Sequence, residues 1–184
     1  MLDAFNTRIR HARYMKCISR LISNVHRGTA YEEEVQKCFD SYGMRLRRVG
    51  GANDGGTDLL GYWHLDDTLK VSLVVQCKAV AQPRGPNVVR ELVGTMQQQS
   101  RDTLGIIVSS AGFTQIAIKT AAMTMLPVGL AVVTEPVGSE SGLCTLFWMN
   151  AAAQKTFPGL VVGMKMVQHK SVSIHYRCRL LNKT

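Results

Sequence analysis

Three polar residues in the middle of the chain have the types and the spacing that metal-assisted hydrolysis requires. Asp58 begins one apolar run, and Gln76 and Lys78 lie near the end of the next one. A divalent cation held by oxygen ligands can polarise a phosphoryl oxygen and activate water, and a nearby lysine can stabilise the developing charge. The pattern therefore indicates cleavage of a phosphodiester, provided that the fold brings these residues together.

Two predicted strands position these residues. Residues 57–63 and 70–80 are apolar and β-branched, and the polar stretch 64–68 between them is typical of a turn. Antiparallel pairing of the two strands would bring Asp58 and Lys78 to the same edge of a sheet. Gln76 would lie on the same strand face as Lys78, because side chains alternate with a period of two.

The remaining elements predict an α/β fold. Thr29 followed by Glu32 has the form of a capping box and predicts a helix over residues 29–42, and residues 44–49 alternate as a strand does. After the paired strands, the spacing predicts a helix over 87–100, a strand over 104–109, a helix that begins after Thr114 and a strand over 128–134. The order αβββαβαβ predicts a mixed central β-sheet flanked by helices on both faces.

The chain divides into three predicted parts, of which the middle part, residues 29–136, forms the core. Residues 1–28 are a basic segment with six basic residues and one acid, so they carry +5 of the net charge of +9. This segment fits either a mitochondrial targeting sequence or an ordinary basic surface helix. Residues 137–184 contain strand-like pieces at 145–148, 160–166 and 171–176, and predict a β-rich extension that packs on the core.

The composition limits the class of protein. The surplus of Lys and Arg favours a polyanionic partner, and nucleic acid is the obvious one. No apolar run approaches the roughly 20 residues that would cross a bilayer, so no membrane span is expected. The five cysteines are widely spread and form no CxxC pair, which indicates free thiols rather than a zinc site.

The motif around the candidate site resembles that of a known family. The turn from Asn53 to Asp58, followed by Gln76-Cys77-Lys78, is similar to the D-G-G-x-D and Q-x-K motifs of the Mrr-type branch of PD-(D/E)xK nucleases. The resemblance extends to Tyr31-Glu32 on the leading helix and to the later segment 110–114. It implies a restriction endonuclease-like core and a DNA endonuclease that depends on Mg²⁺ or Mn²⁺.

The resemblance also implies roles for individual residues. Asp58 would be the principal metal ligand, Gln76 an oxygen ligand or orienting group, and the backbone carbonyl of Cys77 a further ligand. Glu32 would reach the metal directly or through water, although Glu34 in the same run of acids competes with it. Lys78 would activate water and stabilise charge. With only two anionic ligands, the site suits one Mg²⁺ better than two.

The tail carries a second resemblance. Residues 147–152 and 157–163 are similar to the C-terminal extension of fungal mitochondrial Mrr-like proteins required for respiratory growth, which implies a mitochondrial location. Two alternatives stay open beside the nuclease. One is a module with a nuclease fold that only binds or scaffolds nucleic acid, and the other is a structure-selective nuclease that works as a homodimer. The sequence does not select among methylated DNA, branched DNA and RNA as substrates.

Overall fold

The computed structural model describes residues 25–49, 56–66, 69–136, 141–166, 170–177 and 179–181. Most of the predicted basic segment, residues 1–24, lies outside the described residues, as does the greater part of the predicted turn, residues 50–55. None of the described helices is long and apolar enough to cross a membrane.

A six-stranded mixed sheet forms the centre of the molecule. Its strands follow chain order: β1 (Met44–Arg48), β2 (Leu59–His64), β3 (Lys70–Lys78), β4 (Thr103–Ser109), β5 (Val128–Val133) and β6 (Cys144–Met149). The first three strands are antiparallel, β3, β4 and β5 run parallel, and β6 returns antiparallel to β5. The central strands β3 to β5 are nearly continuous apolar runs because both of their faces are buried.

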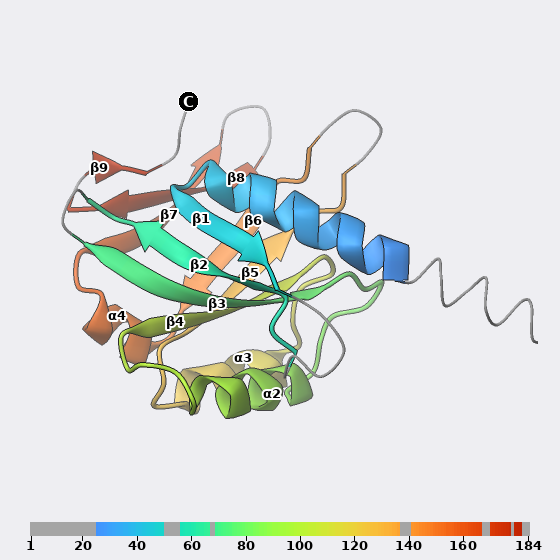
Figure 1. Cartoon of the computed structure of the whole chain (residues 1–184), viewed down its shortest axis with the longest axis horizontal. Coiled ribbons are helices and arrows are strands. Elements are labelled where there is room, and N and C mark those ends of the chain that lie inside the picture. The colour runs from blue at the N-terminus through green and yellow to red at the C-terminus, as the bar shows by residue number, and fades with distance from the viewer. Residues whose placement is uncertain are drawn as a thin grey trace, which may run out of the picture.

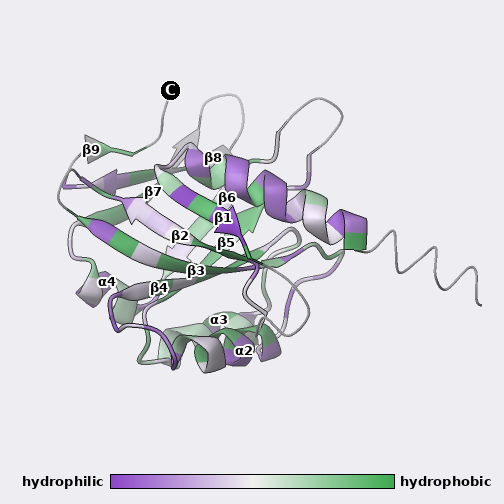
Figure 2. Ribbon diagram, viewed as in Figure 1, coloured by the Kyte–Doolittle hydropathy of each residue, from purple (hydrophilic) through white to green (hydrophobic). Residues whose placement is uncertain are grey.

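Helices cover both faces of this sheet, which confirms the predicted α/β fold class. The first helix, over residues 25–40, lies on one face, and α2 (Asn87–Met96) and α3 (Gln115–Met123) lie on the other (Figure 1). Strand side chains alternate accordingly: Leu73 and Val75 of β3 belong to the cluster under the first helix, whereas Val74 packs with α2 and α3. Figure 2 shows apolar segments of the sheet between these layers.

The first helix differs from its prediction at its start. Residue 25 is already helical, so Thr29 lies inside the helix and is not its N-cap. The Thr29 hydroxyl instead accepts a hydrogen bond from Arg48 of β1 at 3.3 Å. By contrast, Thr114 caps α3 as predicted, because its side chain accepts from the Ala117 amide.

The chain after residue 136 contributes to both the central sheet and a second sheet. Strand β6 joins the central sheet, and a short helix, α4 (Ala151–Thr156), follows it. A three-stranded antiparallel sheet then forms from β7 (Leu160–Met166), β8 (Lys170–Tyr176) and β9 (Arg179–Leu180). Val172 and Ile174 of β8 are buried in the same cluster as Trp63 of β2, so the second sheet shares the core of the first.

A fully hydrogen-bonded asparagine ties β6 to the other side of the molecule. The Asn150 side-chain oxygen accepts from the amides of Ala153 and Val128, so it caps α4 and holds the start of β5. Its amide nitrogen donates to three carbonyls that follow α3 or end it, those of Ala121, Thr124 and Leu126. Asn150 is buried, so each of these bonds would be costly to lose.

Candidate active site

Asp58 lies beside the end of β3, where the predicted hairpin places it. Leu59 pairs with Val75 in the antiparallel register, and the Asp58 amide donates to the Val75 carbonyl at 3.0 Å. The Asp58 carboxylate accepts a hydrogen bond of 2.6 Å from the Cys77 amide. This carboxylate is therefore held against the strand that carries Gln76 and Lys78.

Gln76 and Lys78 lie on the α2 side of the sheet. They alternate with Val75 and Cys77, whose side chains belong to the opposite cluster. The Lys78 ammonium lies 3.9 Å from a carboxylate oxygen of Glu91 on α2, which agrees with this orientation. Asp58 falls on the same face by alternation from Leu59, so the three residues of the motif share one face at one end of the sheet.

The Gln76 side chain is buried without any hydrogen bond. It is 0% exposed, and neither its oxygen nor its nitrogen has a partner among the described residues. A buried amide that lacks partners costs free energy, and such a group in a native fold calls for an explanation. Gly56 makes room for it: a Cβ at position 56 would lie 2.9 Å from the Gln76 nitrogen, and Gly56 has φ +77°.

Cys77 presents its backbone and its side chain to different neighbours. Its amide points toward β2, where it meets Asp58, and in a strand the carbonyl of a residue points to the same side as its amide. Its thiol lies on the face under the first helix. Burial raises the pKa of this thiol well above its usual value, the charges of Asp58 and Glu32 raise it further, and Lys78 and Arg48 partly oppose them. The thiol therefore stays neutral.

Glu32 comes to this region from the opposite face, on the first helix. Its carboxylate accepts from the Arg48 guanidinium at 2.8 Å, and Arg48 also lies 3.7 Å from Glu33. Glu32 is thus engaged by a cation, whereas Asp58, Gln76 and Lys78 gather on the other side of β3. Glu34, the competing acid, is buried and accepts from the Gly142 amide at 2.6 Å, which is a structural contact.

Comparison with known proteins identifies the family of the chain. The family profile Mrr_cat, described as restriction endonuclease, matches residues 25–133, which is more than half of the chain. The chain belongs to this Mrr_cat restriction endonuclease family. The predicted family and the predicted restriction endonuclease-like fold are therefore confirmed.

Three individual proteins are similar to this Mrr_cat chain. It is 34% identical over 142 residues to "Uncharacterized protein C824.03c, mitochondrial" from Schizosaccharomyces pombe, and the match covers 76% of this chain and 57% of the relative. Among solved structures, "MspJI Restriction Endonuclease in Complex with 27-mer Oligonucleotide" has 18% identity and a TM-score of 0.45, covering 66% of this chain and 29% of that one. The "DNA modification-dependent restriction endonuclease AspBHI" has 20% identity and a TM-score of 0.40, covering 47% and 23%.

The donors of the Mrr_cat site fit a hard cation. Within the described ranges, no three His, Cys, Asp or Glu side chains gather as a metal site. The oxygen donors near the end of β3 are one carboxylate, one amide and one backbone carbonyl, from Asp58, Gln76 and Cys77. Oxygen donors of this kind suit Mg²⁺, which usually keeps several waters and takes few protein ligands. The unpartnered oxygen of Gln76 is consistent with such a ligand.

Hydrogen bonds of Ser110 hold the end of β3 that carries Lys78. The Ser110 amide donates to the Lys78 carbonyl, and the Ser110 hydroxyl contacts both the amide and the carbonyl of Val80. Further along, Thr114 and Gly112 bond to the backbone of Arg84. The 110–114 segment of the family motif therefore anchors the chain that leaves the site.

Sequence reasoning missed three residues of the site. Arg48 could have been found, because alternation along Met44–Arg48 puts it on the apolar face toward the first helix. Gly56 belongs to a turn that many hairpins share, and nothing in its context indicated contact with Gln76. Glu91 is an exposed acid on a helix, and helical spacing alone does not show which strand residue such an acid meets.

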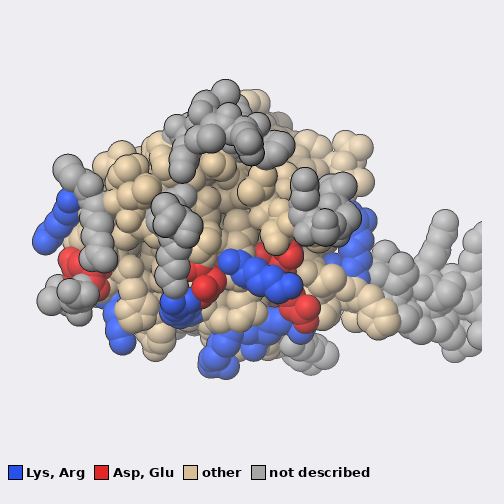
Figure 3. Space-filling view, turned by 90° about the horizontal axis from the view of Figure 1, so that it is seen from above, with Lys and Arg blue, Asp and Glu red and all other residues tan. Residues whose placement is uncertain are grey.

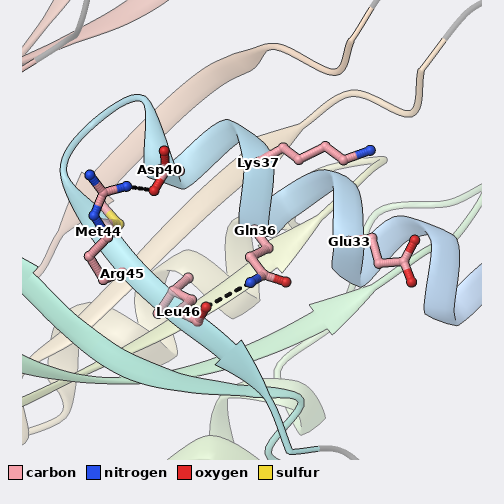
Figure 4. A pocket seen from close by; sticks show the side chains of 7 residues that line it. All are labelled: Glu33, Gln36, Lys37, Asp40, Met44, Arg45 and Leu46. Carbon is pink, nitrogen blue, oxygen red and sulfur yellow. Dashed lines mark hydrogen bonds and ion pairs between the residues drawn. The ribbon is translucent and has the colours of Figure 1, made fainter.

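One groove lies between the first helix and the edge strand β1, where Gln36 donates to the Leu46 carbonyl and Arg45 pairs with Asp40 (Figure 4). Its charged groups largely neutralise one another. Figure 3 shows Lys and Arg side chains close to Asp and Glu along one border of the face seen from above, and mainly uncharged residues elsewhere.

Proposed function

We propose that this protein is a divalent metal-dependent endonuclease that hydrolyses phosphodiester bonds in DNA. One observation carries the proposal: the buried amide of Gln76, which has no hydrogen-bond partner among the described residues, lies beside the anchored carboxylate of Asp58 and on the same face as Lys78. A structural glutamine would be expected to have its hydrogen bonds satisfied. If the Gln76 oxygen is a metal ligand that gains its partner only when a cation binds, the free-energy cost of burying this amide is explained.

Each residue has a role in this proposal. Asp58, Gln76 and the Cys77 carbonyl would hold Mg²⁺ or Mn²⁺, and the cation would polarise the phosphoryl oxygen and activate water when bound. The Cys77 amide orients the Asp58 carboxylate. Lys78 stabilises negative charge that develops on the phosphate, and Glu91 holds its ammonium near the site. Glu32 would act through water, because Arg48 already binds its carboxylate.

A nuclease assay tests the proposal directly. Supercoiled plasmid and linear DNA would be incubated with the purified protein and Mg²⁺ or Mn²⁺, with Asp58→Asn and Lys78→Gln as variants. We expect cleavage by the wild-type protein and at least a hundredfold loss in each variant. Asp102→Asn and Lys155→Gln remove matching charges from exposed positions outside the site and should cut normally. Intact DNA under all conditions would contradict the proposal.

A second function, binding without cleavage, is favoured by one specific contact. Arg48 pairs with Glu32, so Asp58 is the carboxylate that the described residues offer to the proposed metal site, and a site with so little negative charge binds Mg²⁺ weakly. Calorimetric titration of Mg²⁺ into wild type and Asp58→Asn separates the two functions. The nuclease requires a binding isotherm that disappears in Asp58→Asn, whereas a scaffold requires none.

A mitochondrial location is part of the proposal. It is supported by the name of the S. pombe relative and by the excess of basic residues in segment 1–28. The relative is longer, so its location is applied here as a proposal. Fusing residues 1–28 to a fluorescent protein tests it, and a fusion that stays in the cytosol would contradict it. Sedimentation of the purified chain would test the homodimer that junction-selective cleavage requires.

A further inference from the structure

One part of the sheet face that carries the site is covered by none of the described helices. Helix α2 packs on β4 and α3 packs on β5, so the same face of β1, β2 and the beginning of β3 is left open. Tyr62 in the middle of this region is 53% exposed, and Arg47, His64 and Lys70 are also exposed. We call these four residues the open-face residues.

Alternation along the strands puts the open-face residues on the same side as the site. Leu60 of β2 packs toward α2 and α3. Because side chains alternate along a strand, Asp58, Tyr62 and His64 lie on the same face as Leu60. Arg47 pairs with Leu60 across β1 and β2, and His64 pairs with Lys70 across β2 and β3. The open-face residues therefore extend from the row of Leu60, the next row after Asp58 on this face, to the far end of the hairpin, about 13 Å along the strands.

Two basic residues of this face are not paired with any acid that the structure describes. Neither Arg47 nor Lys70 forms an ion pair with any described carboxylate, whereas Arg45 is paired with Asp40 and Arg48 with Glu32. The Lys70 ammonium lies 6.0 Å from the centre of the Tyr62 ring. Two free cations that flank an exposed aromatic ring match a strand with phosphates on its backbone and flat bases between them.

We propose that the open-face residues bind a single-stranded segment of DNA that continues from the phosphate at the active site. Bases of a duplex are stacked on one another and cannot lie on the Tyr62 ring, whereas an unpaired base can. Arg47 and Lys70 would neutralise phosphates on either side of that base. This inference rests on the proposed nuclease function and narrows its substrate to DNA with a single-stranded branch or tail.

Binding without cleavage tests the inference separately from catalysis. Fluorescence anisotropy in EDTA would compare a blunt duplex with the same duplex bearing a short single-stranded DNA tail. We expect the tail to tighten binding by about tenfold and Tyr62→Ser to abolish that gain, while Tyr62→Phe keeps it within about twofold because stacking is retained. Lys70→Gln and Arg47→Gln should each lower the salt dependence by about 0.7 in the logarithmic slope.

Controls make each outcome decisive. Lys37→Gln removes an exposed charge from the first helix, on the opposite side of the sheet, and should change neither affinity nor slope. The inference is overturned if Tyr62→Ser binds the tailed duplex as tightly as wild type, or if Lys37→Gln acts like Lys70→Gln. Preference for an RNA tail would overturn the assignment to DNA. A protein that binds tails as expected but never cuts DNA would contradict the nuclease and leave this surface intact.

Discussion

Replacing Gln76 with methionine should stabilise the metal-free protein, although Gln76 lies at the centre of the proposed site. The side chain is buried and both ends of its amide lack partners among the described residues. Methionine has similar length and flexibility and needs no hydrogen bond. An unsatisfied buried polar group costs roughly 1–3 kcal/mol, so removing the amide should raise the free energy of unfolding by about 2 kcal/mol.

The effect of Mg²⁺ should run in the opposite direction. A ligand that binds only the folded state adds about 2.7 kcal/mol at a hundred times its dissociation constant, and Gln76→Met should lose most of that gain. Urea unfolding in EDTA would measure the effect of the substitution on the metal-free protein, and urea unfolding in saturating Mg²⁺ would measure the stabilisation by the metal. We therefore expect the variant to be the more stable protein in EDTA and to respond little to the metal, while the wild type responds strongly.

The same substitution at a satisfied glutamine provides the control. Gln36 donates its amide hydrogen to the Leu46 carbonyl at 2.7 Å, so Gln36→Met should lower the free energy of unfolding by about 1 kcal/mol. The two variants then shift stability in opposite directions. If Gln76→Met unfolds at a lower urea concentration than wild type in EDTA, the amide has partners that stabilise the fold. The claim that Gln76 lacks partners until a metal binds is then refuted.

Three further predictions follow from contacts around the core and the site. Asn150→Asp keeps the two accepted bonds but sets a carboxylate against three carbonyls, so it should lower the free energy of unfolding by at least about 3 kcal/mol, and an unchanged urea midpoint would contradict this. Gly56→Ala puts a Cβ 2.9 Å from the Gln76 amide and strains a residue with φ +77°, so cleavage should fall about tenfold or more with a stability loss near 1 kcal/mol. Burial raises the pKa of the Cys38 thiol to about 12 and raises the pKa of the Cys77 and Cys144 thiols, so mass spectrometry should find these three unalkylated at mildly alkaline pH until the protein unfolds.

The sequence was sufficient to predict the elements that carry the site. Alternation around Leu59 and Val75 and the turn between them determine one antiparallel register, and that register alone places Asp58 beside Gln76. The parallel strands β4 and β5 were equally predictable, because they are short apolar runs separated by a helix with a threonine cap.

The limits of prediction lie in side chains that reach between elements. Glu32 is predicted to reach the metal directly or through water. Which partner a helix carboxylate meets depends on the angle between helix and sheet, and here Arg48 of β1 is within reach. Whether Glu32 acts through water stays a prediction. Glu34 is similar: nothing near it in the chain indicates that its partner is the amide of Gly142, which is far away in sequence.

The five hydrogen bonds of the Asn150 side chain also decide how short a working protein can be. The family match ends at residue 133, yet a chain cut there would leave the Val128 amide and the carbonyls after α3 without their acceptor and donors. It would also remove β6, so β5 would become an edge strand with unpaired backbone groups that favour aggregation. An isolated nuclease domain should therefore include α4, and it should also keep the second sheet, because Val172 and Ile174 of β8 are buried in the same cluster as Trp63.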